Sequence, residues 1–351
     1  MVSLVWHPHH DLSGANTLGL PCMAERFVAP STPDELAAVL VEAREAGWPV
    51  TVLGGGSNLI LGDWLPGLVV HPEFAEYRCE TLDDRRVRVH VDAGMNWHEL
   101  VMTLAGQGLW GIENLALIPG QCGAAPIQNI GAYGVELADV LERVYLVHLA
   151  DGCEQMLDAA DCAFGYRDSL FKRALDGQVV ITRLELCLST QAAPRLGYGD
   201  LASRVGPAPM ALEVAEAVCA LRREKLPDPS VLANAGSFFK NPVVEADLAD
   251  TLLERYPKMP HFPQPGDRYK LAAGWLIDQC GLKGYREGAF GVHDRQALVL
   301  VHHGGGDAEG LLRFADSIAS RVLERFGVTL EREPRLVGVS EPIGQVGGSK
   351  T

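Results

Sequence analysis

The segment that most limits the possible folds is the glycine turn Gly54-Gly55-Gly56-Ser57-Asn58. Residues 49–53 predict a short strand before it, and glycines after a strand let backbone amides approach a phosphate with no Cβ in the way. The common dinucleotide-binding fold requires a helix that begins at such glycines. Here residues 59–62 are apolar and Pro66-Gly67 follows, which leaves no room for a helix. The sequence thus excludes an ordinary Rossmann domain; a hairpin turn between two strands is the alternative for these glycines.

Length and charge exclude several classes of protein. The 351 residues provide material for roughly two to three domains, and 47% of them are hydrophobic. A net charge of −15 argues against a protein that binds nucleic acid through its phosphates. No apolar run is long enough to insert into a membrane, and residues 1–10 lack a secretion signal. We therefore expect a cytoplasmic protein, and no obligatory protein partner is evident.

The cysteines and histidines give little support for a metal site. The eight cysteines are scattered without a Cys-x-x-Cys pair, which fits reduced thiols better than disulfides or zinc. Histidines cluster at residues 7–10 and at 302–303. A metal could bind at either place, but a floppy terminus and a strand end are the favoured interpretations.

A second run of small residues, at positions 111–134, suggests a ligand surface. Its glycines and alanines form a surface against which a flat ring or a diphosphate could lie. A packing seam between two sheets is the alternative, but a seam would not require Gln128 and Asn129 at its centre. We favour the ligand interpretation.

Periodicity and end signals predict the main helices and strands. Thr32, Pro33 and Glu35 form a helix start with a capping box, and Asn96 caps a second helix that ends near Gly108. Further helices are predicted at residues 211–224, 270–280 and 307–326, and strands at 86–91, 140–149, 179–188 and 297–301.

The residues 225–242 have neither a helical nor a strand period, yet they place polar side chains between apolar ones. Ser237 follows Gly236, so its hydroxyl is a candidate nucleophile or proton donor, or merely part of a loop. Arg167 is a candidate anion clamp, or a partner of the adjacent Asp168. Glu333 is a carboxyl near a strand end, for which a surface charge is the favoured interpretation.

Several motifs in the same order carry a resemblance to a known family. They are Asn16-Thr17-Leu18-Gly19, the glycine turn at 54–58, Ile118-Pro119-Gly120, residues 127–134, Tyr166-Arg167, residues 234–242 and Glu333. Together they resemble the UDP-N-acetylenolpyruvoylglucosamine reductases, the MurB flavoenzymes of peptidoglycan precursor synthesis. Tyr198-Gly199-Asp200-Leu201 is similar to the form of the family that keeps an extra substrate-covering segment.

The resemblance implies an α+β fold with a two-lobed FAD-binding region of the vanillyl-alcohol-oxidase type and a C-terminal α/β substrate-binding domain. The implied boundaries are 1–72 and 73–225 for the two FAD-binding lobes, 226–333 for the substrate domain, and 334–351 for a tail that returns towards the first lobe. The implied reaction is reduction of FAD by NADPH, then reduction of the enolpyruvyl ether of UDP-N-acetylglucosamine to UDP-N-acetylmuramate.

The resemblance also implies the roles of individual residues. Ser237 would give the proton, while Arg167 and a protonated Glu333 would flank the substrate carboxylate. The nucleotide sugar would be held by Tyr166, Tyr198, Lys225, Asn241 and Gln296. FAD would be held by Gly54, Gly55, Gly56, Ser57, Asn58, Pro119, Gly120, Gly123, Ala124, Gln128, Asn129, Gly131, Ala132 and Tyr133. Pro334 departs from the expected β-branched residue and restricts Glu333 to extended geometry, which a strand tolerates.

Two other functions remain open from the sequence. One is an FAD-dependent oxidase on the same flavin fold that acts on a different sugar or alcohol. The other is a flavin-binding or nucleotide-sugar-binding protein without catalytic activity.

Overall fold

The computed structural model describes residues 5–339. Its first part is a four-stranded sheet in the order β1-β2-β5-β3, in which β1 is antiparallel to β2 and the other pairs are parallel. The strands are β1 (His7–Asp11), β2 (Met23–Val28), β3 (Val50–Val52) and β5 (Trp64–Val70). The interpretation of residues 7–10 as a floppy terminus is wrong, because they form the edge strand β1.

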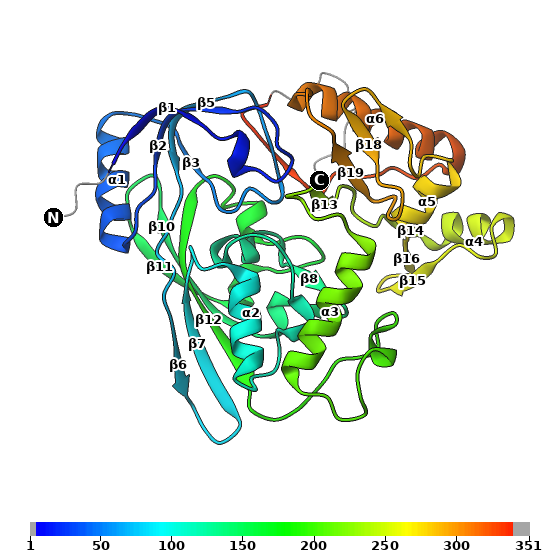
Figure 1. Cartoon of the computed structure of the whole chain (residues 1–351), viewed down its shortest axis with the longest axis horizontal. Helices are drawn as coiled ribbons and strands as arrows, with labels where there is room; N and C mark the ends of the chain where they lie inside the picture. Colours follow the sequence, from blue (N-terminus) through cyan, green and yellow to red (C-terminus); the bar gives the residue numbers. More distant parts are fainter. Residues whose placement is uncertain (1–4, 340–351) are drawn as a thin grey trace.

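Helix α1 (Pro33–Glu45) covers one face of this sheet (Figure 1) and buries the apolar side chains of Leu36, Val39, Leu40 and Ala43. The Thr32 hydroxyl accepts a hydrogen bond from the Glu35 N–H at 3.1 Å, as predicted. The return half of the predicted capping box is wrong. The Glu35 carboxylate accepts instead from the Ser31 N–H at 2.8 Å, one residue before the cap, so the turn is closed by a neighbouring donor.

The second part is a five-stranded antiparallel sheet in the order β11-β10-β12-β7-β6. Helices α2 (Trp97–Gly106) and α3 (Ala211–Lys225) pack on one face over the largest hydrophobic core of the chain. The strands are β6 (Tyr77–Thr81), β7 (Arg86–Asp92), β10 (Leu141–His148), β11 (Glu154–Asp158) and β12 (Val179–Ser189).

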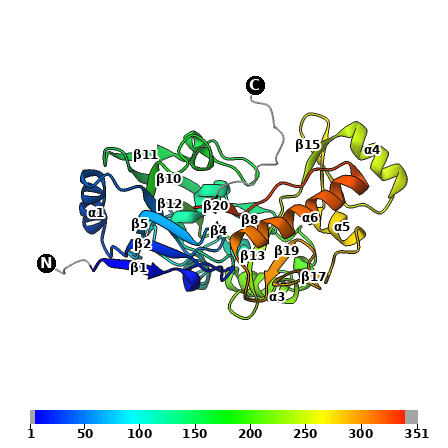
Figure 2. The ribbon, with the colours of Figure 1, turned by 90° about the horizontal axis from the view of Figure 1, so that it is seen from above.

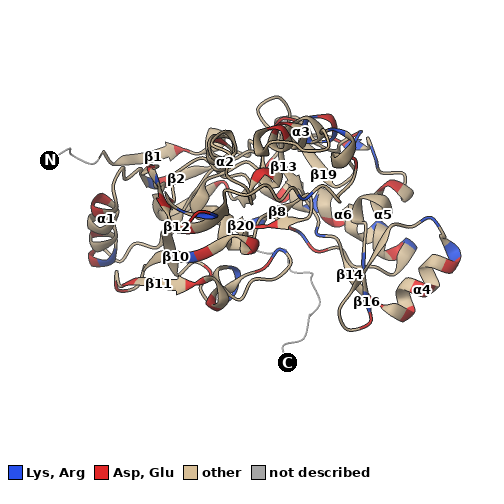
Figure 3. Ribbon diagram, turned by 90° about the horizontal axis from the view of Figure 1, so that it is seen from below, with Lys and Arg blue, Asp and Glu red and all other residues tan. Residues whose placement is uncertain are grey.

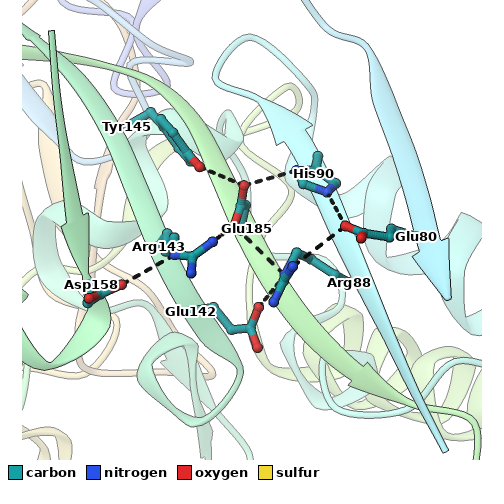
Figure 4. A network of polar contacts seen from close by, with 8 residues as sticks. All are labelled: Glu80, Arg88, His90, Glu142, Arg143, Tyr145, Asp158 and Glu185. Atoms are coloured by element: carbon teal, nitrogen blue, oxygen red, sulfur yellow. Dashed lines mark hydrogen bonds and ion pairs between the residues drawn. The ribbon is translucent and has the colours of Figure 1, made fainter. Parts of the chain in front are cut away.

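The opposite face of this sheet carries a polar network around a buried carboxylate (Figure 4). Glu185, 3% exposed, accepts hydrogen bonds from the Tyr145 hydroxyl at 2.8 Å and from Arg143 Nη1 at 3.1 Å. His90 Nδ1 lies 3.0 Å from Glu185 Oε1, and its Nε2 lies 3.1 Å from Glu80 Oε2. The network also includes Arg88, Glu142 and Asp158. Charged side chains therefore replace a covering helix on this face.

The C-terminal part contains a four-stranded sheet, β13-β19-β18-β17, and a three-stranded sheet, β14-β16-β15. Its helices are α4 (Ala246–Arg255), α5 (Ala273–Gln279) and the long α6 (Ala308–Phe326). Its strands are β13 (Ala233–Ser237), β14 (Val243–Glu245), β15 (His261–Gln264), β16 (Arg268–Leu271), β17 (Arg286–Glu287), β18 (Phe290–Val292) and β19 (Val299–His302).

Two predictions in this part are wrong for local reasons. The segment 225–242, which has no strand period, contains β13, because a register shift between Asn234 and Ser237 and a φ of +70° at Gly236 break the alternation. The predicted helix at 270–280 begins only at Ala273, since the residues before it pair in β16.

The chain returns to its first part at its end. β20 (Arg335–Val337) pairs in parallel with β4 (Leu59–Leu61), and these two strands lie between the N-terminal and C-terminal parts (Figure 2). A short antiparallel pair is formed by β8 (Gly131–Ala132), at the end of the second glycine run, and β9 (Val135–Glu136), which follows it. Short 3₁₀ turns occur at Ser13–Ala15, Glu113–Leu115, Cys122–Gln128, Leu137–Asp139, Ala159–Cys162, Leu170–Lys172 and Leu201–Ser203.

Among residues 5–339, no helix combines the length and apolar character that a membrane crossing requires, and no cluster of His, Cys, Asp or Glu could hold a metal ion. All eight cysteines are free thiols. His302 is fully engaged, since Nδ1 lies 2.8 Å from the Leu18 carbonyl and Nε2 accepts from the Gly306 N–H at 3.0 Å. Acidic and basic positions are interspersed along most elements (Figure 3).

Candidate active site

A cavity of about 570 Å³ lies where the three parts of the chain meet. Its wall includes the glycine turn at 54–58, the second glycine run, the end of β13, Glu333 and β20. Cavities of this size hold cofactors and other small molecules in many proteins. The apolar side chains of Val50, Val52 and Val179 line it as well, so the cavity has a partly apolar wall in addition to its polar groups.

The glycine turn joins β3 to β4, which belong to different sheets, so the hairpin alternative is wrong. A Cβ on Gly55 would lie 2.9 Å from Gly120 Cα, and a Cβ on Gly56, whose φ is +59°, would lie 2.0 Å from the Ala15 carbonyl oxygen. Within residues 5–339, the N–H groups of 54–58 donate no hydrogen bond to the protein. The glycines therefore bring two backbone segments into contact and leave a row of amide donors for a ligand.

The second glycine run folds into the 3₁₀ turn at Cys122–Gln128 and lines the cavity through Gly123, Ala124 and Gln128. A Cβ on Gly123 would lie 2.6 Å from Ala93 Cβ, so this glycine is required by packing. Gln128 Oε1 accepts from Asn58 Nδ2 at 2.6 Å, which joins the two glycine segments through their side chains.

Asn129 is buried away from the cavity and organises the loop around it. With a φ of +46°, it donates to Glu136 at 2.7 Å and to the Gly165 carbonyl at 3.2 Å, and it accepts from the Ala138 N–H at 3.0 Å. These hydrogen bonds within the loop explain why an amide side chain occurs at this position. Asn129 therefore no longer argues against a packing seam.

Arg167 adopts the left-handed region, with a φ of +54°, a conformation that costs free energy for a residue with a Cβ and is concentrated at functional sites. Its Nη2 donates to the Gly131 carbonyl at 2.9 Å, and its Nε lies 3.0 Å from Glu333 Oε1. The alternative that Arg167 pairs with its neighbour Asp168 is wrong, because Asp168 pairs with Arg173 at 3.3 Å.

Glu333 is buried, 8% exposed, so its interpretation as a surface charge is wrong. Gln128 Nε2 donates to its Oε1 at 3.3 Å, and the Glu333 N–H donates to the Phe238 carbonyl at 2.9 Å, directly beside Ser237. Burial raises the pKa of the Glu333 carboxyl, although Arg167, Lys172 and Lys240 oppose the rise. The arrangement favours a carboxyl that keeps its proton to higher pH than an exposed glutamate does.

Ser237 lines the cavity at the end of β13. The Asn234 side chain accepts from the Gly236 N–H at 2.9 Å and fixes the bulge that precedes the serine. Phe238 and Phe239, which follow it, are fully buried with their rings edge to face at 5.3 Å. This anchor holds the backbone at the serine in place in the wall of the cavity.

The structure brings together most of the predicted catalytic and cofactor residues and leaves others outside. The cavity is lined by Gly54, Gly55, Gly56, Ser57, Asn58, Pro119, Gly123, Ala124, Gln128, Gly131, Arg167, Ser237 and Glu333. The residues that do not line it are Gly120, Asn129, Ala132, Tyr133, Tyr166, Tyr198, Lys225, Asn241 and Gln296.

Several of these outer residues have identifiable contacts. Asn241 Oδ1 accepts from the Ala273 N–H at 3.0 Å and so caps α5. The Tyr166 ring receives the Lys270 ammonium 4.6 Å from its centroid, and burial raises the pKa of the Tyr166 hydroxyl. Tyr198, 57% exposed, packs edge to face on Tyr133 with the ring centroids 5.7 Å apart.

Sequence reasoning missed three cations near the cavity. Arg222 and Arg335 line it, and Lys172 lies close enough to Glu333 to oppose the rise of its pKa. Burial, followed by repulsion from Lys240, lowers the pKa of Lys172. Arg222 and Arg223 are adjacent on α3. The apolar period of this helix indicates that Arg222 lies near the buried face, but it does not indicate that Arg222 lines a cavity.

Comparison with known proteins identifies the family. A family model described as the UDP-N-acetylenolpyruvoylglucosamine reductase C-terminal domain matches residues 228–337, and one described as an FAD binding domain matches residues 24–156. The UDP-N-acetylenolpyruvoylglucosamine reductase of Chromobacterium violaceum is 48% identical over 332 residues, covering 93% of this chain and 97% of the relative. That of Ralstonia nicotianae is 47% identical over 337 residues, covering 94% and 98%.

A solved structure agrees with this. The UDP-N-acetylenolpyruvylglucosamine reductase (MurB) from Thermus caldophilus superposes with a TM-score of 0.64 at 27% identity, covering 95% of this chain and 98% of that chain. The α+β fold with an FAD-binding region and a MurB-type C-terminal domain is thereby confirmed, as is the resemblance carried by the motifs. The chain belongs to the UDP-N-acetylenolpyruvoylglucosamine reductase family.

Proposed function

We propose that this chain catalyses the reaction for which its family is named, the FAD-dependent reduction of enolpyruvyl-UDP-N-acetylglucosamine to UDP-N-acetylmuramate, with NADPH as reductant. The observation that carries the proposal is the meeting of Ser237, Arg167 and Glu333, which come from distant parts of the chain, at one cavity. Family membership supplies the substrate class. Because NADPH and nucleotide sugars are cytoplasmic metabolites, we propose that compartment for the enzyme.

The residues of the cavity fit FAD. The N–H groups of 54–58 suit a diphosphate, since they donate no hydrogen bond to the protein within residues 5–339. Apolar side chains such as Val50 and Val179 suit a ring system. We propose that residues 1–72 and 73–225 hold the cofactor, that 226–333 receive the substrate, and that the tail from 334 closes on β4; residues 340–351 lie outside the described part.

Bound FAD would supply the chemistry that carries a hydride from NADPH to the methylene carbon of the substrate. That addition pushes negative charge towards the substrate carboxylate and leaves the adjacent carbon in need of a proton. In our proposal the Ser237 hydroxyl donates this proton, and Arg167 together with a protonated Glu333 stabilises the carboxylate. The burial of Glu333, which favours its protonated form, and the left-handed backbone of Arg167 support these roles, because both features cost stability and such features are concentrated at functional sites.

We propose that NADPH and the nucleotide sugar use the same cavity in turn. The glycine turn leads into β4 and not into a helix, so the wall offers no ordinary dinucleotide site beside the one assigned to FAD. The diphosphate of the sugar nucleotide is assigned to Lys225, at the end of α3, and the remainder of the substrate to Tyr166, Tyr198, Asn241 and Gln296. Lys225 is exposed, and Leu226, which follows it, lines the cavity.

The experiment is an anaerobic flavin spectrum of the purified protein. NADPH should bleach the flavin band, and enolpyruvyl-UDP-N-acetylglucosamine should restore it with formation of UDP-N-acetylmuramate, identified by mass. Restoration by oxygen with a simple sugar or alcohol, but not by the nucleotide sugar, would favour an oxidase. A flavin that NADPH leaves oxidised would favour a protein that binds flavin without catalysis.

A further inference from the structure

Three polar side chains form a row from the glycine turn to the carboxyl of Glu333. Asn58 Nδ2 donates a hydrogen bond to Gln128 Oε1 at 2.6 Å, and Gln128 Nε2 donates to Glu333 Oε1 at 3.3 Å. All three residues line the cavity. The proposed reaction gives a task only to the last member of the row, so the two amides that lead to it remain to be explained.

The main chain fixes the direction of these hydrogen bonds. Asn58 Nδ2 also lies 3.4 Å from the Glu333 carbonyl oxygen, which can only accept, so this end of the Asn58 amide is its NH₂ group. The Gln128 amide therefore turns its oxygen towards Asn58 and its NH₂ group towards Glu333. The Arg335 N–H donates to the Asn58 carbonyl at 3.0 Å, which holds the backbones at the two ends of the row against each other.

The two oxygens of the Glu333 carboxyl are consequently different. Oε1 accepts from Gln128, and Arg167 Nε lies 3.0 Å from the same oxygen, so a donor and a positive charge both oppose a proton there. Within residues 5–339, no hydrogen bond reaches Oε2. Oε2 is thus the oxygen that can carry the proton and offer it to a ligand.

We propose that Gln128 is a positioning residue that places the proton of Glu333 on Oε2. This proposal rests on the proposed function. The O–H group at Oε2 is the donor that meets the substrate carboxylate, on which negative charge builds as the hydride adds. Asn58 sets the direction of the Gln128 amide, and Gln128 passes that direction on to the acid. Neither amide makes or breaks a covalent bond.

The test reverses the polarity of the row while keeping its shape. In Asn58→Asp the new carboxylate can only accept, so the Gln128 amide turns and presents its oxygen to Glu333. The proton then moves to Oε1, away from the substrate. Reoxidation by saturating enolpyruvyl-UDP-N-acetylglucosamine should slow by about ten- to a hundredfold. Rates are measured per bound flavin in protein saturated with FAD, so that weaker cofactor binding does not affect them.

The pH profile separates the position of the proton from its presence. The new carboxylate disfavours ionisation of Glu333, while Arg167, Lys172 and Lys240, which oppose the rise of its pKa, are unchanged. In Asn58→Asp the alkaline decline of reoxidation should therefore move to higher pH, although the rate below the decline is lower. A variant that merely lost the protonated acid would show the decline at lower pH.

A second substitution should rescue the first. In Asn58→Asp combined with Gln128→Leu the reversed amide is gone, so the rate should rise to that of Gln128→Leu alone. Gln128→Leu itself should lose less than about tenfold, because Arg167 still faces Oε1. Gln128→Glu also reverses the polarity but keeps Asn58, and it should slow reoxidation as Asn58→Asp does.

Asn96→Asp is the matched control. It adds the same charge at an exposed helix cap, where aspartate serves equally well, and should change neither the rate nor the pH profile. Wild-type reoxidation in either reversed variant overturns the proposal, and so does a double variant no faster than Asn58→Asp, or equal slowing in Asn96→Asp. Failure of the proposed function would look different, because the wild-type flavin would then not be reoxidised by the enolpyruvyl substrate at all.

Discussion

Ser237 has a position that suits a proton donor more than a nucleophile. It lies at the cavity on a bulge fixed by Asn234, and the neighbouring carboxyl, Glu333, is paired with Arg167. Ser237→Ala should leave reduction of the flavin by NADPH intact and slow reoxidation by the enolpyruvyl substrate by a factor of about a hundred to a thousand or more. Rapid-reaction measurement of the two half-reactions checks this.

Ser230→Ala is the matched control for Ser237→Ala. Ser230 lies on the same connecting segment, and its hydroxyl donates to Asp228 at 2.7 Å at an exposed position. Its replacement should change neither half-reaction. Reoxidation at the wild-type rate in Ser237→Ala would remove Ser237 from the proton-donor role.

Glu333 gives the second half-reaction a predicted pH dependence. Burial raises the pKa of this carboxyl, so it stays protonated to higher pH and charges as the pH rises through that value. If the protonated form assists the reaction, the rate of reoxidation falls on the alkaline side by about tenfold per pH unit. Glu333→Gln should remove this decline while keeping part of the rate, and reduction by NADPH serves as the internal reference. A decline that persists in Glu333→Gln would assign it to another group.

The same pKa has a consequence for stability. A group whose folded pKa is raised contributes its full stabilisation below the unfolded pKa and loses it as the pH rises through the folded pKa. The burial of Glu333 thus makes the folded protein less stable above the folded pKa of this carboxyl than below its unfolded pKa.

At the residue level, sequence motifs indicated Ser237, Arg167 and Glu333, but not their surroundings. The burial of Glu333 and its pairing with Arg167 depend on contacts between distant segments, which no local pattern reports. Lys172 and Arg222 were missed for the same reason, since a cation on a turn or a helix has the same sequence signal whether it faces solvent or a cavity.

Among the elements, the glycine turn between β3 and β4 offers a direct test of the cofactor site. Gly55→Ala should cost about 1 to 3 kcal/mol, because its Cβ would lie 2.9 Å from Gly120 Cα. The variant should also lose affinity for FAD, since the two glycine segments would be pushed apart. Titration of the apoprotein with FAD and chemical unfolding measure the two effects.

Gly106→Ala is the control for this substitution. Gly106 ends α2, and a Cβ there would meet nothing within 4 Å. Its replacement should stabilise the protein by about 0.5 to 1 kcal/mol and leave FAD affinity unchanged, because helical glycine is costly. Equal behaviour of Gly55→Ala and Gly106→Ala would contradict the packing role of Gly55.

The polar face of the five-stranded sheet is expected to respond to acid. Although burial opposes it, the Tyr145 hydroxyl, His90 and Arg143 together lower the pKa of Glu185. Its contribution to stability is then present above the unfolded pKa and is lost as the pH falls through the folded value. Glu185→Gln should cost about 1 to 3 kcal/mol at pH 7 and less at about pH 4. Chemical unfolding at both pH values measures this, with the exposed Glu154→Gln as control; an equal loss at both would contradict it.

The helices were the most predictable elements, because caps and apolar periods mark them locally. α1 begins where its cap signals predict, and α6 follows its predicted boundaries to within a residue. β13 was not predictable, since its bulge at Gly236 interrupts the alternation by which strands are recognised. β4 was predictable as a strand, but no local pattern indicated its partner, because β20 lies far along the chain; only the family resemblance implied that residues 334–351 return towards the first lobe.

For the whole molecule, the cavity is where the three parts share a surface, so FAD should stabilise them together. Removal of FAD should lower the stability by about 2.7 kcal/mol relative to protein in FAD at a hundred times the dissociation constant. Thermal unfolding with and without added FAD measures this. The Gly55→Ala variant should gain much less stability from FAD at the same concentration. An equal gain would show that FAD binding does not depend on the glycine turn.

The pairing of β20 with β4 sets an order of events during synthesis of the chain. Asn58 and Glu333, whose contact helps to close the cavity, are 275 residues apart. At about 5 to 20 residues per second, the ribosome delivers Glu333 roughly 15 to 55 s after Asn58. Throughout that interval the nascent chain carries β4 as a strand edge without its partner, and such edges invite aggregation. A chain that ends shortly before Arg335 would thus lack β20 and leave β4 without its partner.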